Sequence, residues 1–331
     1  MSVSGTTSFS QTQYQVIQAA FNILNVYGIG RTFSAEDYTL AVQMLNMMIK
    51  AWGTKGLHLW CKEEGVLYLQ QYTSRYGFGN SSSIGLTPAY TTLSSGAYTA
   101  QTTVSAALGA NTLIVSSTAN FVTGQYIGVV QSDMSLFWTT ISSVTNSTTV
   151  VLAASIPVAV NTAANVYVFT ALLNKPYRII SARLRYGFDS GATSTVNDII
   201  MNPLSHAEYE ALPTKSTNGS TPNQYYYDPQ TDYGVMNIWV RPIDCSYRIH
   251  FTYERIIDDI TNATDNFDFP QEWYEPITWQ LALRLAFPFA KLKQYAQLKE
   301  MATMMLDNLL EFDTEQTGIS FQPDRDGGGI Y

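Results

Sequence analysis

A long stretch with almost no charge limits what this chain can fold into more than any other feature. Of the 99 residues between Arg75 and Lys175, only Asp133 has a charged side chain. The stretch is rich in threonine, serine, alanine, valine and glycine, arranged in short runs. β-Branched runs bounded by glycine, asparagine and serine are typical of short antiparallel strands. A chain this rich in valine, isoleucine and aromatic residues is not disordered, so we expect a small β-barrel or sandwich here.

Charge returns to ordinary density on both sides of this stretch, which predicts a host domain interrupted by an insert. We place the inserted β domain at residues 84–171, the host domain at 1–83 and 172–313, and an extended C-terminal tail at 314–331. A chain of 331 residues has room for two cores. The predicted fold class is α+β: a helical host with about four main helices and a β-hairpin or small sheet, an inserted all-β barrel or sandwich, and the tail.

Apolar residues at helical spacing predict the helices. Ser34 followed by Asp37 is typical of a helix N-terminus, and so is Ser205 followed by Glu208. The second helix carries two apolar stripes, which indicates either burial on two sides, one of them against a neighbouring subunit, or a place at the centre of its own domain. The predicted helices cover, in chain order, residues 12–27, about 34–53, 205–211, 272–287 and 292–313.

Runs of β-branched and aromatic residues predict the strands. In the host we expect a strand over residues 64–72, and a hairpin whose strands are 235–240 and 247–254 with its turn at 242–244. In the insert, the predicted strands are residues 111–115, 124–130, 138–141, 148–152 and 165–169.

Metal, cofactor and membrane signals are weak throughout the sequence. Cys61 and Cys245 provide neither a disulfide framework nor a metal-ligand spacing. His58, His206 and His250 lie far apart, and none has a metal-binding partner at the usual spacing. The first residues lack the basic start and apolar run of a secretory signal, and no run approaches the ~18 apolar residues of a membrane span. We expect no metal, no cofactor and no membrane span.

Catalytic motifs are also missing from the sequence. It contains no Gly-x-Ser-x-Gly, no Walker loop and no dinucleotide fingerprint. The adjacent acids Glu63 and Glu64, and likewise Asp258 and Asp259, offer two carboxylates, as glycoside hydrolysis requires. Neighbouring residues on a strand point to opposite faces, which argues against a working pair. We therefore predict that the chain is not an enzyme and has no catalytic residues.

The net charge of −8 is unevenly distributed. Residues 256–331 carry 5 basic and 13 acidic groups, so the whole imbalance lies there. A sequence-specific DNA-binding protein would present a basic face instead. An acidic wall would repel DNA phosphates and let a duplex slide past; the alternative is an ordinary solvated helix face.

One basic cluster stands out, formed by Lys175, Arg178, Arg183 and Arg185. Such a patch can contact a phosphate backbone without reading sequence, so these three arginines are candidate DNA-backbone contacts. The favoured alternative is that the cluster is neutralised by nearby acids, namely Asp189, Glu208 and Glu210.

Several host segments, taken together, carry a family resemblance. After the helical pair at the start, they are Lys175–Arg183, Pro222–Asp228, Met236–Pro242, Tyr247–Glu254 and Pro270–Glu275. In this order they resemble the head-to-tail adaptor proteins of tailed, mainly short-tailed, bacteriophages, also called packaged-DNA stabilisation or tail accessory proteins. The resemblance covers residues of about 10–75 and 172–313, and it rests on patterns rather than on invariant motifs.

The resemblance implies a ring of identical copies, expected to be a dodecamer, beneath the portal protein at the head-tail junction of the virion, assembled in the host cytoplasm. The ring would extend the channel for double-stranded DNA, retain the packaged DNA and offer a docking platform to the tail nozzle or hub protein. In that family the C-terminal extension grips the portal, which makes Phe321, Ile330 and Tyr331 the candidate portal-binding residues. The insert, which smaller family members lack, would then project outward to contact tail fibres or the capsid.

Two other hypotheses stay open. The chain is alternatively an oligomeric receptor- or glycan-binding protein that acts through the charge-poor insert, while its helices only oligomerise it. It is otherwise a cell-wall hydrolase that uses Glu63 or Glu64. Carbohydrate binding by the insert would favour the first, and peptidoglycan cleavage lost in Glu63→Gln or Glu64→Gln would favour the second.

Overall fold

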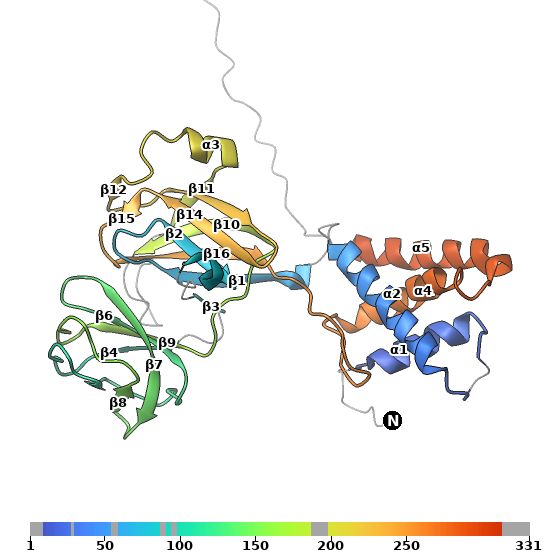
Figure 1. Ribbon diagram of the computed structural model, residues 1–331, viewed down its shortest axis with the longest axis horizontal. Helices are drawn as coiled ribbons and strands as arrows, with labels where there is room; N and C mark the ends of the chain where they lie inside the picture. The colour runs from blue at the N-terminus through green and yellow to red at the C-terminus, as the bar shows by residue number, and fades with distance from the viewer. Residues whose placement is uncertain are drawn as a thin grey trace, which may run out of the picture. The chain divides into compact units, whose positions relative to one another are not determined.

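The chain folds into two compact units. One consists of residues 1–60 and 257–331, and the other of residues 61–256. The two places where the chain passes from one unit to the other are neighbours in space, because the Arg255 amide donates to the Cys61 carbonyl at 2.9 Å. Figure 1 shows the computed structural model, which describes residues 9–27, 30–53, 59–86, 91–93, 98–186 and 198–312.

Helices make up the first unit. α4 lies at its centre, because α1, α2 and α5 all pack against it. This confirms the four main helices that the sequence predicts, although each is shorter than predicted. Short 3₁₀ turns, η3 (Gln271–Trp273) and η4 (Leu292–Gln294), lead into α4 and α5. The helices are α1 (Gln13–Ile23), α2 (Ala35–Gly53), α4 (Tyr274–Leu285) and α5 (Tyr295–Phe312).

Local signals explain where these helices begin. Thr12 and Gln15 form a capping box at the start of α1. Before α2, the Asp37 amide donates to the Ser34 hydroxyl at 3.1 Å, as predicted. One apolar stripe of α2 is buried, whereas Met47 of the second stripe is 54% exposed. Leu40 and Met44, the other members of the second stripe, are half-buried, so the described part of the chain covers this stripe only in part.

An eight-stranded sheet dominates the second unit and is larger than the small sheet expected from the sequence. Its strand order is β2-β14-β13-β11-β10-β16-β1-β3. The sheet curls, because Phe78 of β2 and Phe251 of β16 lie in one core with ring centroids 5.9 Å apart. The strands are β1 (Lys62–Tyr68), β2 (Arg75–Gly79), β3 (Thr91–Leu93), β10 (Arg178–Tyr186), β11 (Asp198–Pro203), β13 (Gln224–Pro229), β14 (Tyr233–Trp239) and β16 (Tyr247–Glu254).

The predicted hairpin of residues 235–240 and 247–254 is wrong. Strands β14 and β16 form there, but β14 pairs with β13 and β2, while β16 pairs with β1 and β10. Pro242, which was predicted in the turn, lies in the short strand β15 (Arg241–Pro242), which pairs with β12 (Asn218–Gly219). Alternation in a sequence indicates which face of a strand is buried but not which strand lies beside it.

A six-stranded antiparallel sheet lies inside the stretch that is poor in charge. Its order is β4-β9-β6-β7-β8-β5, and it has an apolar core of its own. All five strands predicted for the insert are confirmed, whereas β4 was missed, and so was β3, which joins the eight-stranded sheet beside β1. The six-stranded sheet falls within the predicted insert, whose boundaries at 84 and 171 stay a prediction. The strands are β4 (Tyr98–Gln101), β5 (Thr112–Ile114), β6 (Tyr126–Val130), β7 (Leu136–Val144), β8 (Thr149–Leu152) and β9 (Asn165–Phe169).

The two sheets of the second unit share an aromatic seam. Val66 and Tyr68 of β1 lie in one apolar cluster with side chains of the six-stranded sheet. The Tyr68 ring is 4.5 Å from that of Tyr167 and 5.4 Å from that of Trp138. Trp138 lies across its strand partner Gly128, where an added Cβ would come within 2.5 Å of the indole ring. The missing side chain at Gly128 therefore makes room for Trp138.

Replacing Gly128 by alanine should loosen the seam. The new methyl group would collide with the rigid indole of Trp138, and overpacking of this kind costs about 1–3 kcal/mol. Chemical denaturation followed by tryptophan fluorescence should show a corresponding loss in the free energy of unfolding. Gly53→Ala is the control, because its Cβ would meet nothing within 4 Å. Equal stability of Gly128→Ala and the natural chain would contradict the packing described here.

Candidate assembly surfaces

One face of β10 and its neighbouring strands carries paired arginines. The Arg183 guanidinium donates to Glu64 of β1 at 2.8 Å and lies 3.1 Å from a carboxylate oxygen of Asp198 in β11. Arg185 donates twice to the same Asp198 carboxylate, at 2.8 and 2.9 Å. The hydrogen bond from Arg185 is the main cause that holds the pKa of Asp198 below its ordinary value, and the charges of both arginines act in the same direction. Two of the candidate DNA contacts are thus already ion-paired.

The acids that neutralise this cluster differ from those predicted. Arg178 pairs with Glu254 of the adjacent strand. Glu208 instead caps α3 (His206–Ala211) with Ser205, which confirms the predicted helix start. Glu210 pairs with a lysine of the following loop, and Asp189 lies outside the described residues. The actual partners come from strands paired with β10, and cross-strand register is what the sequence does not reveal. A role of the three arginines in contacting DNA stays a prediction.

His250 lies on the same face and is only 8% exposed. The Nε of Arg248 donates to its Nε2 at 3.0 Å, so this ring nitrogen is an acceptor. Burial, as the largest cause, and the charges of Arg185, Arg248 and Arg183 together lower the pKa of His250 to about 3, although the charge of Asp198 acts in the opposite direction. The imidazole is therefore neutral at ordinary pH and has the structural role predicted for it. His206 contacts the ring of Tyr226, and His58 lies outside the described residues.

Glu63 and Glu64, the adjacent acids of β1, lie on opposite faces of the sheet and have different partners. The Tyr253 hydroxyl donates to Glu63 at 2.8 Å, and Arg255 lies 3.0 Å from the same carboxylate. Glu64 is bound by Arg183 instead. Two carboxylates held separately by cations cannot act on one glycosidic bond, because that chemistry needs both at a single bond.

Clustered metal ligands and long apolar helices are both absent from the described parts of the chain. There, no group of three or more histidine, cysteine, aspartate or glutamate side chains could hold a metal ion. Within the same ranges, no helix combines the length and the apolar character needed to cross a membrane.

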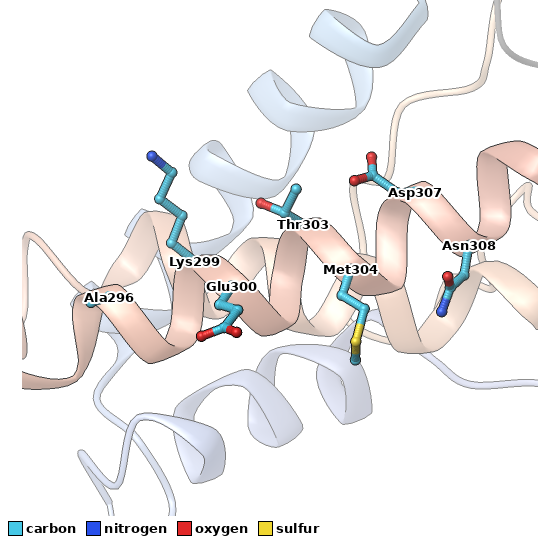
Figure 2. Close-up of a pocket in the computed structure, with 7 residues that line it drawn as sticks. All are labelled: Ala296, Lys299, Glu300, Thr303, Met304, Asp307 and Asn308. Atoms are coloured by element: carbon cyan, nitrogen blue, oxygen red, sulfur yellow. The ribbon is translucent and has the colours of Figure 1, made fainter.

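A shallow groove runs along one face of α5. All of its lining residues belong to this helix and recur at spacings of three and four, which places them on one face. Figure 2 shows Lys299, Thr303 and Asp307 along one side of it and Glu300, Met304 and Asn308 along the other. The buried stripe of α5 consists of other residues: Leu298, Ala302 and Leu309. The groove face is thus open, and Met304 in it is 45% exposed.

An apolar surface, here called the corner patch, lies where α4 leads into α5. It consists of Phe287, Leu292 and Tyr295, and the rings of Phe287 and Tyr295 are 4.8 Å apart. Phe287 is 59% and Leu292 56% exposed. Sequence reasoning missed this patch because it assigned the segment to helix ends. The available signal was a set of apolar residues around Pro288 that no buried stripe required.

The predicted portal-binding residues Phe321, Ile330 and Tyr331 lie outside the described residues, so their role stays a prediction. What the described chain presents is ion-paired sheet faces, an open helix groove and an exposed apolar patch. These features are typical of a structural protein that works through contacts with other chains.

A comparison with protein families shows which family the chain belongs to. Residues 100–323 match the family described as SU10 adaptor protein, from β4 to beyond the end of α5. The match covers more than half of the 331 residues, so the chain belongs to this family of bacteriophage structural adaptor proteins, which is not an enzyme family. No curated protein matches the chain. The resemblance to phage adaptors is thus confirmed at the level of the family.

Replacing Asp198 by asparagine should destabilise the arginine face, because Arg183 and Arg185 would lose a shared carboxylate. Hydrogen bonds to charged groups contribute about 1.5–3 kcal/mol, and we expect a loss near the lower end at pH 7 because the site is partly exposed. The folded-state pKa of Asp198 is lowered from 3.8. The stabilisation is therefore present above that value and is lost as pH falls through the folded-state pKa. Denaturation at pH 7 and in acid measures both effects, and Glu210→Gln, at a surface pair, should cost less than about 1 kcal/mol.

His250 predicts a second pH dependence. The folded imidazole stays neutral down to about pH 3, whereas in the unfolded chain it takes up a proton below 6.5. The unfolded state thus binds more protons in this window, and stability falls as pH drops from 6.5, by up to about 1.4 kcal/mol per pH unit. In His250→Gln, the part of the slope of unfolding free energy against pH that comes from this imidazole should disappear. His206→Gln is the control: His206 is exposed on α3, so this variant should keep that part of the slope. An unchanged slope in His250→Gln would contradict the assignment.

Proposed function

We propose that this chain forms the ring between the portal protein and the tail of a bacteriophage. The family match over residues 100–323 is the observation that carries the proposal. In the ring, expected to be a dodecamer, copies of the chain extend the DNA channel, help to retain the packaged DNA and present a docking platform to the tail nozzle or hub protein. Its place is the portal vertex of the virion, after assembly in the host cytoplasm.

The charge distribution supports passage of DNA rather than tight binding. Exposed acids on α5, among them Glu300, Asp307 and Glu311, would repel phosphates if this helix faces the channel. The arginines of β10 have their charge balanced by neighbouring carboxylates. Contacts of Arg178, Arg183 and Arg185 with double-stranded DNA would then be weak and independent of sequence.

We assign the remaining parts by the same proposal. Residues 314–331 reach the portal, with Phe321, Ile330 and Tyr331 as anchors, while the host at 1–83 and 172–313 forms the ring. The insert at 84–171 contacts tail fibres or the capsid. Leu108 and Val122, which are 70% and 60% exposed on this part of the chain, are suitable contact residues. Deleting the whole insert would also uncover Val66 and Tyr68 in the seam, so point variants test its role more cleanly.

Sedimentation of the full-length protein with its phage's portal ring tests the proposal. A discrete larger complex should form, and it should be lost when residues 314–331 are removed or when Phe321, Ile330 and Tyr331 are replaced by serine. Leu108→Ser with Val122→Ser is the matched control and should leave portal binding intact. If the intact chain fails to bind the portal but binds carbohydrate through the insert, the adaptor proposal is wrong and the glycan-binding alternative is favoured.

A further inference from the structure

We propose that in the free chain the C-terminal segment, residues 313–331, folds back along the α5 groove and places Phe321 on the corner patch. The first argument is exposure. Phe287 and Leu292 of the patch are 59% and 56% exposed, and the ring of Phe287 lies beside that of Tyr295. Apolar side chains gathered in this way at a surface mark a contact site.

The charge around the corner patch indicates which side chains a segment bound there must contain. Lys291 and Lys293 flank Leu292 in the chain, and the residues from 286 to 295 include no acid. A ligand for this surface should therefore combine an aromatic side chain with nearby carboxylates. The lysines would attract the carboxylates while the patch covers the ring.

The C-terminal segment has this composition. Phe321 is followed by Asp324 and Asp326, and residues 313–331 carry four acids against one arginine. Residues 316–322, which would cross the groove, have no charged side chain. In the sequence, Asp313 and Glu315 directly follow Asp307 and Glu311 of α5, so charge would not attract the first residues of the segment, and the attraction would act on Asp324 and Asp326.

The lengths agree with this arrangement. α5 has 18 residues, and at a rise of about 1.5 Å per residue it is ~27 Å long. The nine residues from Asp313 to Phe321, at about 3.3 Å each when extended, span ~30 Å. A chain that turns back at the end of α5 therefore brings Phe321 to the start of α5, next to the turn η4 that contains Leu292. The groove supplies the path, because its residues continue the line of Leu292 at helical spacing through Ala296, Lys299 and Thr303.

Fold-back would give the segment two alternative partners. Phe321 is also one of the residues that we propose to contact the portal, so docking on the corner patch would keep it covered until the portal displaces it. This regulatory consequence rests on the proposed function, whereas the fold-back itself concerns the isolated chain and does not.

Disulfide trapping in the full-length protein tests the fold-back. The variant Ala296→Cys/Ile319→Cys places one thiol in the groove and the other on the same side of the extended segment as Phe321, because side chains alternate along an extended chain. An added mild oxidant supplies the oxidising equivalents. Cys61 and Cys245 are 1% and 8% exposed, so they compete little. The control is Gln297→Cys/Ile319→Cys: Gln297 is also exposed and is one residue further along α5, but it lies outside the groove face. The stretch of chain that joins the two cysteines is nearly the same length in both variants.

We expect the cross-link within one chain to form roughly tenfold faster in the Ala296→Cys variant, as a correspondingly higher effective concentration would produce. Adding Phe321→Ala or Leu292→Ser, or raising the salt concentration, should reduce the rate toward that of the control. Equal cross-linking rates in the two variants would mean that the C-terminal segment is not bound along the groove, and would overturn the proposal. Cross-linked dimers in place of cross-linked monomers would also overturn it, because the occupant would then be a second copy. Portal binding is measured separately, so its failure would leave this result unaffected.

Discussion

The double pairing of β16 is the constraint on which the second unit depends. This strand pairs along its length with β1 on one side and with β10 on the other, and Glu254 lies opposite both Lys62 and Arg178. β1 and β10 bracket the long excursion of the chain that contains the six-stranded sheet. Since the entropy of closing a loop grows slowly with its length, two ladders on one strand suffice to hold the ends of so long an excursion together.

The dependence on pairing between distant strands also explains which parts of the structure could be predicted from the sequence and which could not. The capping pair Ser205 and Glu208, and the opposite orientation of Glu63 and Glu64, follow from a few adjacent residues, so the sequence was sufficient for them. The neighbours of β14 and the acids that neutralise Arg183 depend on register between distant segments, which alternation does not encode. The corner patch was missed for a related reason, because helical spacing shows which residues share a face but not whether another element covers that face.

Together, the surfaces divide the chain by chemistry. On the face of β10, arginines and carboxylates from neighbouring strands satisfy one another, so little net charge is left for a partner. Elsewhere, by contrast, apolar side chains are more than half exposed: Met47, Phe287 and Leu292 on the helical unit, and Leu108 and Val122 on the second unit. Uncovered apolar surface supplies more free energy on association than ion pairs that must first be broken. Contacts of this phage adaptor with other chains are thus better sought at such apolar side chains than on the arginine face.

The hydrogen bond between Arg255 and Cys61 also has a mechanical meaning. Cys61 precedes β1 and Arg255 follows β16, so both connections leave the second unit at the same end of this strand pair. A force that draws the two units apart would pull β1 and β16 in the same direction and share the load between them. Their mutual ladder would carry little of it, and the shear would pass instead to the ladders that join them to β3 and β10. The strength of the chain under tension is therefore set by these two outer ladders.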